Sequence, residues 1–225
     1  MAQVKRGRAA AQERAKEVYA RLAAYYPNAH CTLDYKDAST LLIMTILAAQ
    51  STDARVNIVA KDLFKKYRKP ADFLTVPLSE LESDIKPCGF FRAKAKSIVG
   101  ACRQLVEKHE GWVPGTMEEL VALPGVGRKT ANVVLGECFG VPAVIVDTHC
   151  TRVSNRLGFT RQPDAVKIEQ DLMKVWPEKL WTQFSHLMVF HGRAICVARG
   201  PKCSQCPVND LCPFPHSAEG KKVAR

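Results

Sequence analysis

Two helical segments in the middle of the chain are joined by the stretch Leu-Pro-Gly-Val-Gly-Arg-Lys-Thr-Ala, residues 123–131. Its glycines, Gly125 and Gly127, permit a tight turn in which no side chain covers the backbone N–H groups. The second helix then begins, and a helix N-terminus favours an anion. Many helices are joined in this way, but here Arg128 and Lys129 follow the turn in a basic chain. The stretch therefore predicts a helix-hairpin-helix that binds DNA phosphates.

The charge of the whole chain agrees with a nucleic-acid partner. The 225 residues include 33 lysines and arginines against 22 aspartates and glutamates, so the net charge is +11. Such an excess favours a polyanion, nucleic acid before a membrane surface. The longest apolar run, residues 41–49, is too short to span a bilayer, and no apolar stretch follows the basic N-terminus. We therefore expect a cytoplasmic protein without a membrane partner, associated with the nucleoid if the source is bacterial. A monomer is also expected.

Outward from the hairpin, apolar residues recur at helical spacing along most of the chain. The clearest helical segments are 53–67, 94–106 and 128–139. Ser79 with Glu82, and Thr116 with Glu119, are capping-box signatures that predict helix starts. Together these patterns predict an all-α fold.

One run is typical of a strand instead. Residues 141–146 are almost continuously apolar, but a single run is too isolated to build a sheet. The helical pattern gives way at this point, so a domain boundary is expected near Pro142.

Four of the nine cysteines lie close together near the C-terminus, in the pattern Cys196-x6-Cys203-x2-Cys206-x5-Cys212. Without a secretory signal the compartment is expected to be reducing, so the cluster indicates metal binding rather than disulfides. Zinc and a [4Fe–4S] cluster both accept four cysteines. A structural zinc usually pairs two Cys-x2-Cys units, whereas this loop has one, flanked by wider gaps. The spacing therefore favours the bulkier [4Fe–4S] cluster.

Three motifs of the chain, taken in their order, resemble those of the endonuclease III family. Its members are base-excision DNA glycosylases with AP lyase activity. The motifs are the hairpin at 123–131, Val-Asp-Thr-His at 146–149 and the four-cysteine loop at 196–212. The resemblance runs from about residue 15 to residue 215, and the three motifs in this order are highly specific.

The resemblance implies an all-α protein of two helical lobes with a DNA cleft between them. One lobe, residues 31–141, would be a six-helix barrel that carries the helix-hairpin-helix at about 118–139. The other lobe would be discontinuous and join residues 1–30 to 142–225. It would hold the [4Fe–4S] cluster in the cysteine loop at 196–212.

The resemblance also implies catalytic roles for two residues. Lys129 stands at the position of the family's nucleophilic lysine, which forms a Schiff base with C1′ of the damaged nucleotide before β-elimination. Read without the family, Lys129 is a surface lysine that meets phosphate. Asp147 matches the catalytic aspartate, which is expected to activate Lys129 and to help proton transfer. Its plain interpretation is a helix N-cap.

Other residues would contact DNA once the damaged base has left the stack. Gln50 matches the glutamine that fills the vacated space, and Phe90 aligns with an apolar wedge into the opposite strand. The simpler interpretations are a helix-terminal polar residue for Gln50 and a core aromatic for Phe90. Phe90 replaces a leucine common in the better-known bacterial enzymes, and Ala48 replaces a serine. The remaining residues that the resemblance places at the DNA are Gly125, Gly127, Arg128 and His149.

The resemblance thus implies a bifunctional DNA glycosylase/AP lyase that acts on oxidised pyrimidines or abasic sites in double-stranded DNA. A pyrimidine-dimer glycosylase of the same branch would share Lys129 and Asp147. An adenine-mismatch glycosylase of the superfamily normally lacks the lysine. A non-catalytic iron–sulfur protein that binds DNA or senses redox state would need neither residue, so their joint presence argues for catalysis.

Overall fold

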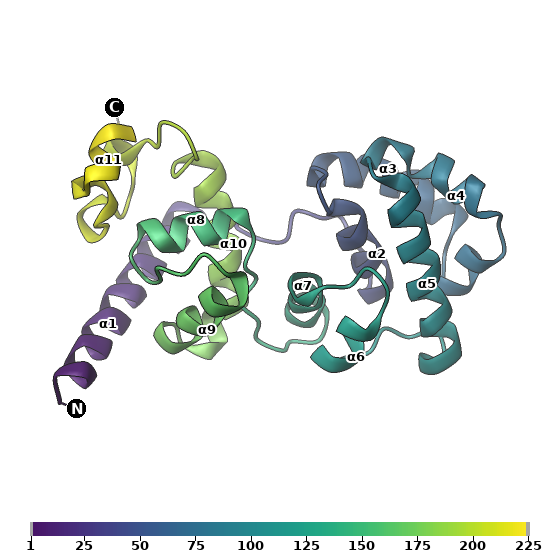
Figure 1. Cartoon of the computed structure of the whole chain (residues 1–225), viewed down its shortest axis with the longest axis horizontal. Helices are drawn as coiled ribbons and strands as arrows, with labels where there is room; N and C mark the ends of the chain where they lie inside the picture. Colours follow the sequence, from purple (N-terminus) through teal and green to yellow (C-terminus); the bar gives the residue numbers. More distant parts are fainter. Residues whose placement is uncertain (1, 224–225) are drawn as a thin grey trace. The chain divides into compact units, whose positions relative to one another are not determined.

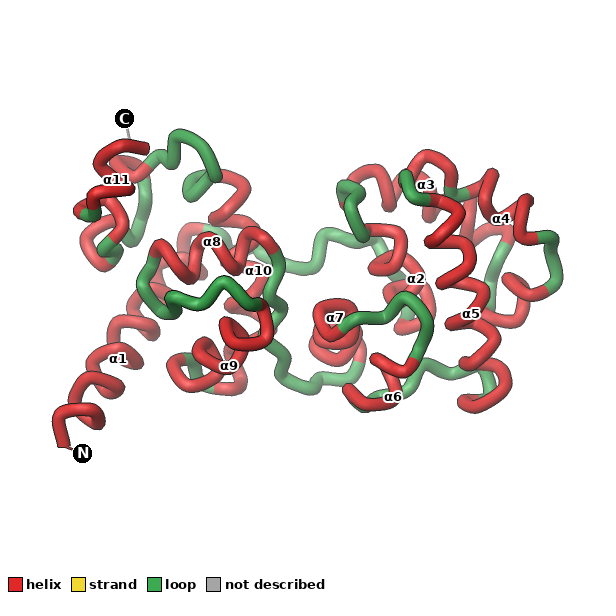
Figure 2. Tube along the Cα trace, in the orientation of Figure 1, coloured by secondary structure: helices red, strands yellow, loops and turns green. Residues whose placement is uncertain are grey.

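The computed structural model describes residues 2–223, with side chains from residue 9 onward, and within that part it contains helices and loops but no strand (Figures 1 and 2). The all-α class expected from the sequence is confirmed. Contacts within the chain divide it into two compact units. The central unit is Thr32–Val141, and the terminal unit joins Met1–Cys31 to Pro142–Arg225. In the described part of the chain, no helix combines the length and apolar character that a bilayer span requires.

The central unit is built around a helix that is apolar on all sides. In α2 (Ala38–Ala48) every residue from Thr40 to Leu47 is buried, as expected for a helix at the centre of a core. The helices around it are α3 (Asp53–Lys66), α4 (Leu78–Asp84), α5 (Phe91–His109), α6 (Met117–Ala122) and α7 (Arg128–Cys138). Short 3-10 helices η1 (Pro70–Leu74) and η2 (Lys86–Cys88) complete the unit. The three helices that the apolar spacing predicted are present as α3, α5 and α7.

The terminal unit is formed by the N-terminal and the C-terminal segments of the chain (Figure 1). Its helices are α1 (Ala2–Tyr25), α8 (Thr148–Arg156), α9 (Ala165–Val175), α10 (Trp181–Ala194) and α11 (Ala218–Val223). Helix α10 packs against α8 and α1, and α1 also packs against α9. The core includes an aromatic stack, in which the ring of Trp176 lies 4.0 Å from that of Phe184, centroid to centroid. This packing gives α8 a rigid support.

The run at 141–146 is an extended loop rather than a strand. Hydroxyl groups of α10 satisfy its backbone in place of a partner strand. The N–H of Ile145 donates to Oγ of Ser185 at 2.9 Å, and the N–H of Ala143 donates to Oγ1 of Thr182 at 3.3 Å. Residues 143–146 of this run are buried, and Val144 and Val146 belong to the core of the terminal unit.

One of the two capping-box predictions is wrong. Helix α4 begins at Leu78 after Pro77, so Ser79 lies inside the helix and does not cap it. Pro77 is the N-cap residue instead, and its carbonyl accepts a hydrogen bond from the N–H of Glu80 at 3.0 Å. The second prediction is confirmed in its essential part, since the hydroxyl of Thr116 accepts a hydrogen bond from the N–H of Glu119 at the start of α6.

Candidate active site and cluster loop

The turn between α6 and α7 depends on one of its two glycines. Gly125 has a φ of +77°, and a Cβ atom there would lie 2.5 Å from Cβ of Ser97 on α5. Gly127 is the N-cap of α7 with a φ of −91°, which any residue can adopt, and a Cβ atom there would meet nothing within 4 Å. Gly125 is therefore needed for the turn and its packing, whereas Gly127 leaves open space at the start of α7.

The start of α7 has the properties of an anion site. Gly127 supplies no side-chain cap to the first N–H groups of the helix. Such groups have no partner within the helix, and the helix dipole adds positive potential there. Arg128 and Lys129 are the first two residues of α7, and both side chains are exposed. An anion and the amine of Lys129 can therefore meet at the same helix end.

Gln50 and Phe90 share an uncommon backbone conformation. Gln50 has a φ of 54° just after α2, and Phe90 has a φ of 48° just before α5. Glu110, the third non-glycine residue with positive φ in the described chain, is explained as the C-cap of α5. Both Gln50 and Phe90 are exposed, and 66% of Phe90 is accessible to solvent. Phe90 is thus not a core aromatic, and left-handed non-glycine residues tend to mark functional sites.

Asp147 caps α8 in the terminal unit. Its Oδ1 accepts a hydrogen bond from the N–H of Cys150 at 2.7 Å, so the N-cap interpretation describes its local geometry. The cap uses one carboxylate oxygen, and the residue is half-buried. Asp147 is therefore held in one orientation by the helix while its second oxygen is not needed for the cap.

His149 is the second residue of the same helix, and its side chain packs against α10. Its Nδ1 is 3.1 Å from Nη2 of Arg152, which also donates to the carbonyl of Gly192 at 2.9 Å. Burial lowers the pKa of His149, and Arg152 and Arg193 add to this, whereas Asp147 opposes it. A Cβ atom on Gly192 would lie 2.9 Å from Nδ1, so the imidazole packs directly on the helix backbone. His149 is thus a fixed side chain in which the neutral form is favoured.

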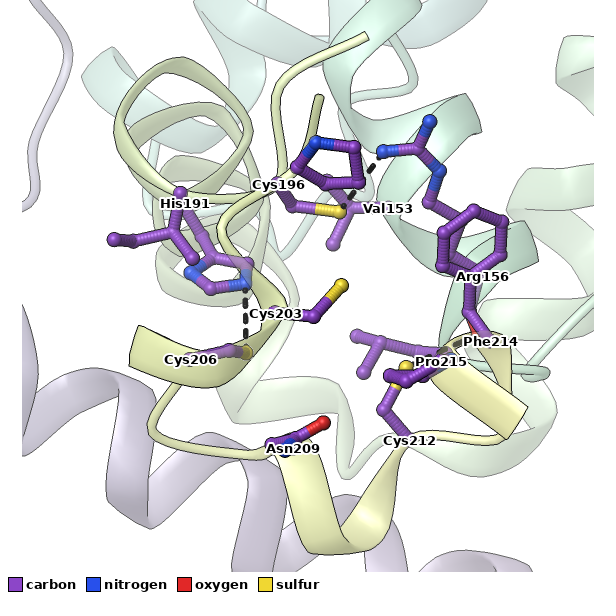
Figure 3. Close-up of a pocket in the computed structure, with 13 residues that line it drawn as sticks. Val153, Arg156, His191, Cys196, Cys203, Cys206, Asn209, Cys212, Phe214 and Pro215 are labelled. Atoms are coloured by element: carbon purple, nitrogen blue, oxygen red, sulfur yellow. Dashed lines mark hydrogen bonds between the residues drawn. The ribbon is translucent and has the colours of Figure 1, made fainter. Parts of the chain in front are cut away.

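The four cysteines of the loop at 196–212 line a single cavity in the terminal unit (Figure 3). Cys196 follows the end of α10, and Cys203 begins the short helix η4 (Cys203–Gln205). Cys206 and Cys212 are the C-caps of η4 and of η5 (Asn209–Leu211). The two short 3-10 helices separate Cys203 from Cys206 and Cys206 from Cys212, and all four side chains line the same space.

This cavity fits a group larger than one ion. Among the described residues, no three His, Cys, Asp or Glu side chains converge closely enough to hold a single metal ion. Burial, with a smaller contribution from the neighbouring cysteines, raises the pKa of Cys206 and of Cys212 to about 11. Four thiolates can share this space only around a cationic group, since metal ligation requires the deprotonated form. The donor set and its spread therefore fit a [4Fe–4S] cluster better than zinc.

Comparison with known proteins identifies the family. Residues 43–178 match the HhH-GPD superfamily base excision DNA repair model, and residues 196–212 match the iron–sulfur binding domain of endonuclease III. An endonuclease III from Synechocystis sp. is 49% identical over 214 residues, which cover 95% of this chain and 98% of the relative. The chain belongs to the endonuclease III family.

Solved structures of the family agree with this assignment. A non-covalent endonuclease III–DNA complex superposes with a TM-score of 0.87 at 47% identity, over 94% of this chain and 97% of that one. A trapped endonuclease III–DNA covalent intermediate, an estranged-adenine complex, superposes with a TM-score of 0.88 at 47% identity, over 95% and 99%. Membership makes the chain a base-excision DNA glycosylase/AP lyase with a [4Fe–4S] cluster, as the resemblance implied.

The cluster loop is organised by an arginine that no sequence motif indicated. Arg156 at the end of α8 donates from Nη1 to the carbonyl of Val197 at 2.7 Å, and from Nη2 to that of Ala198 at 3.0 Å. Its Nη1 also lies 3.5 Å from Sγ of Cys196, and its guanidinium stacks over the ring of Phe214 at 4.5 Å (Figure 3). One helix of the family fold therefore holds Asp147 at its start and the cluster loop at its end.

Two further residues of the terminal unit support the loop. Arg152, one turn before Arg156, donates from Nε to the carbonyl of Cys196 at 3.0 Å. His191 on α10 is buried, with Nε2 3.5 Å from Sγ of Cys206 and Nδ1 3.1 Å from the hydroxyl of Tyr26. The only sequence signal for these loop contacts was the four-residue spacing of Arg152 and Arg156. This spacing places both residues on one face of the helix that follows Asp147.

Proposed function

We propose that the enzyme removes oxidised pyrimidines from duplex DNA and then cleaves the strand at the abasic site, with Lys129 as the nucleophile. The observation that carries the proposal is the start of α7. There an exposed lysine stands beside uncapped helix N–H groups and the open space at Gly127. A DNA phosphate bound at this helix end would bring the sugar backbone within reach of the amine.

The chemistry follows from an amine placed beside the sugar. The Nζ of Lys129 attacks C1′, the bond from C1′ to the base breaks, and the base leaves with a proton. The sugar ring opens to give an imine between C1′ and Nζ. Loss of a proton from C2′ then expels the 3′ phosphate by β-elimination, and water releases the lysine. The relative trapped as a covalent DNA intermediate supports a covalent step of this kind.

Asp147 is proposed to stabilise positive charge on the sugar and to move protons. A carboxylate fixed by a helix cap is already oriented before the substrate arrives, so little reorganisation is needed. The hydrogen bond to Cys150 supplies this orientation. The cluster supplies structural support to the loop when it is bound, and the residues that would hold it are Cys196, Cys203, Cys206 and Cys212.

DNA recognition is proposed to depend on backbone contacts and on inserted side chains. Gly125 and Gly127 shape the phosphate site, and Arg128 and His149 add contacts to the DNA. Gln50 and Phe90 would fill the space that an extruded nucleotide leaves, which their exposure supports. The enzyme is expected to act as a monomer on duplexes that contain damaged bases or abasic sites, because each chain carries its own lysine, aspartate and cluster loop.

A panel of duplexes, each with one lesion, tests the substrate class. We expect strand cleavage of a duplex with one oxidised pyrimidine and of the same duplex with an abasic site. A duplex with a pyrimidine dimer and one with an adenine mismatch serve as comparisons. Faster cleavage of either comparison duplex than of the oxidised pyrimidine would contradict the proposed substrate class while leaving the lyase step intact.

A further inference from the structure

Lys94, in the first turn of α5, is a buried lysine that the proposed chemistry does not use. Only 5% of its surface is exposed, which is rare for a lysine unless its ammonium group is fully paired. Its Nζ donates to the carbonyl of Leu47 at 2.8 Å and to the carbonyl of Cys88 at 2.8 Å. Burial lowers the pKa of Lys94, and Cys88 opposes this shift.

The two carbonyls end two different elements of the central unit. Leu47 lies in the last turn of α2, and Cys88 is the last residue of η2. Carbonyls at such positions have no donor within their own helix, and α2 has no basic residue in its last turn to supply one. Lys94 therefore caps both elements at once from a third element, α5.

Each capped element is followed by one of the two exposed left-handed residues. Gln50 comes three residues after Leu47, and Phe90 comes two residues after Cys88. A left-handed non-glycine residue persists only where its surroundings fix the backbone on both sides. For both residues, the preceding backbone is fixed by the same amino group.

We infer that Lys94 is a positioning residue that fixes the segments carrying Gln50 and Phe90 relative to each other. Both side chains can then enter the DNA together. The inference rests on the proposed function, in which these two side chains fill the space of an extruded nucleotide. Lys94 itself is buried and does not touch the substrate. A misplacement of about 1 Å can lower a rate by as much as 10²-fold. The relative position of the two segments therefore affects the rate as well as folding.

The test compares two substrates in one duplex sequence. One duplex carries a single base-paired oxidised pyrimidine, and the other carries an abasic site, which is already partly unstacked. The variants are Lys94→Met, which keeps the length of the side chain but cannot donate, and Lys94→Arg, which retains N–H donors. Ile98→Ala, in the same helix and with a fully buried side chain, is the control for general loss of core packing. Unfolding by denaturant is measured for each protein.

We expect Lys94→Met to slow processing of the base-paired lesion about tenfold to a hundredfold, with a much smaller loss on the abasic site. Lys94→Arg should process the base-paired lesion faster than Lys94→Met does. Ile98→Ala should change the rates on both substrates by the same factor. In the Lys94→Met background, Gln50→Ala and Phe90→Ala should each lower the rate less than they do in the wild-type chain. The backbone positions on which both side chains depend are already lost there.

Equal loss on both substrates, or no loss in a folded Lys94→Met protein, would overturn the inference. If Lys94→Met does not fold, Lys94→Arg decides, with the same selective loss expected at smaller size. Failure of both variants to fold would assign Lys94 to stability alone and would also overturn it. Failure of the proposed function is recognised separately, since Gln50→Ala and Phe90→Ala would then leave the wild-type rates unchanged.

Discussion

At the scale of single residues, the two hairpin glycines contribute in different ways, and a matched pair of substitutions separates them. Gly125→Ala should destabilise the protein by about 1–2 kcal/mol from the left-handed backbone alone, and the clash with Ser97 adds to this. Gly127→Ala should fold normally, because its φ is ordinary and its Cβ meets nothing. The added methyl group should nevertheless lower affinity for duplex DNA by blocking the approach of a phosphate. Denaturant unfolding and duplex titration measure the two effects, and wild-type affinity in Gly127→Ala would argue against a phosphate at this helix end.

Asp147 has two roles that one conservative substitution can separate. Asp147→Asn keeps the cap on Cys150, since asparagine caps a helix as well as aspartate. It removes the carboxylate, so the rate of base removal should fall by roughly the 10²–10⁴ typical of a lost acid–base group. Asp164→Asn is the matched control, because Asp164 caps α9 in the same way through the N–H of Lys167. Unfolding of Asp147→Asn together with an unchanged rate per folded molecule would leave the cap as its only role.

Single residues also mark the limit of what the sequence could predict. The cysteine pattern and the hairpin glycines could be identified because their spacing itself constrains the chemistry. Lys94 and Arg156 could not, because a lysine or arginine on an amphipathic helix is usually solvated, and only the fold shows which carbonyls it reaches. Phe90 had a core interpretation that its 66% exposure excludes. Its left-handed backbone is a tertiary property that no local pattern encodes.

At the scale of elements, α8 connects Asp147, its N-cap, to the cluster loop. Arg156→Lys should keep the charge but lose the planar guanidinium, whose two Nη atoms donate to the carbonyls of Val197 and Ala198. We expect the protein to lose its cluster faster, followed as decay of the visible absorption of thiolate-bound iron. Arg199→Lys, an exposed arginine on the same loop, is the control. Equal decay in the two variants would show that Arg156 does not organise the loop.

The helices themselves were largely predictable, and the exceptions have physical reasons. α3, α5 and α7 each bury one face, so apolar spacing identified them. Residues 143–146 are buried without forming a strand, because hydroxyls of α10, far along the sequence, accept hydrogen bonds from their backbone. Ser79 failed as a cap because Pro77 already occupies the N-cap position of α4. Tertiary partners and proline geometry both overrode the local signal.

At the scale of the whole molecule, the charge of +11 predicts a steep salt dependence of DNA binding. Each neutralised phosphate should add about −0.9 to the slope of log K against log salt for undamaged duplex. Phosphate contacts carry little sequence information, so two duplexes of unrelated sequence should give the same slope. Titrations at several salt concentrations measure it. A flat profile would show that the positive charge serves another purpose.

The central claim is that Lys129 forms a covalent bond with the sugar, and reductive trapping tests it most directly. Borohydride reduces an imine to a stable amine, so wild-type protein incubated with a lesion-containing duplex should become cross-linked to DNA. Digestion and mass spectrometry should then locate the adduct on Lys129. Lys129→Ala should give neither cross-link nor strand cleavage while it still binds duplex DNA, and Lys61→Ala, which removes an exposed lysine of α3, should behave as wild type. A cross-link of undiminished yield in Lys129→Ala, or an adduct mapped to another amine, would contradict the account.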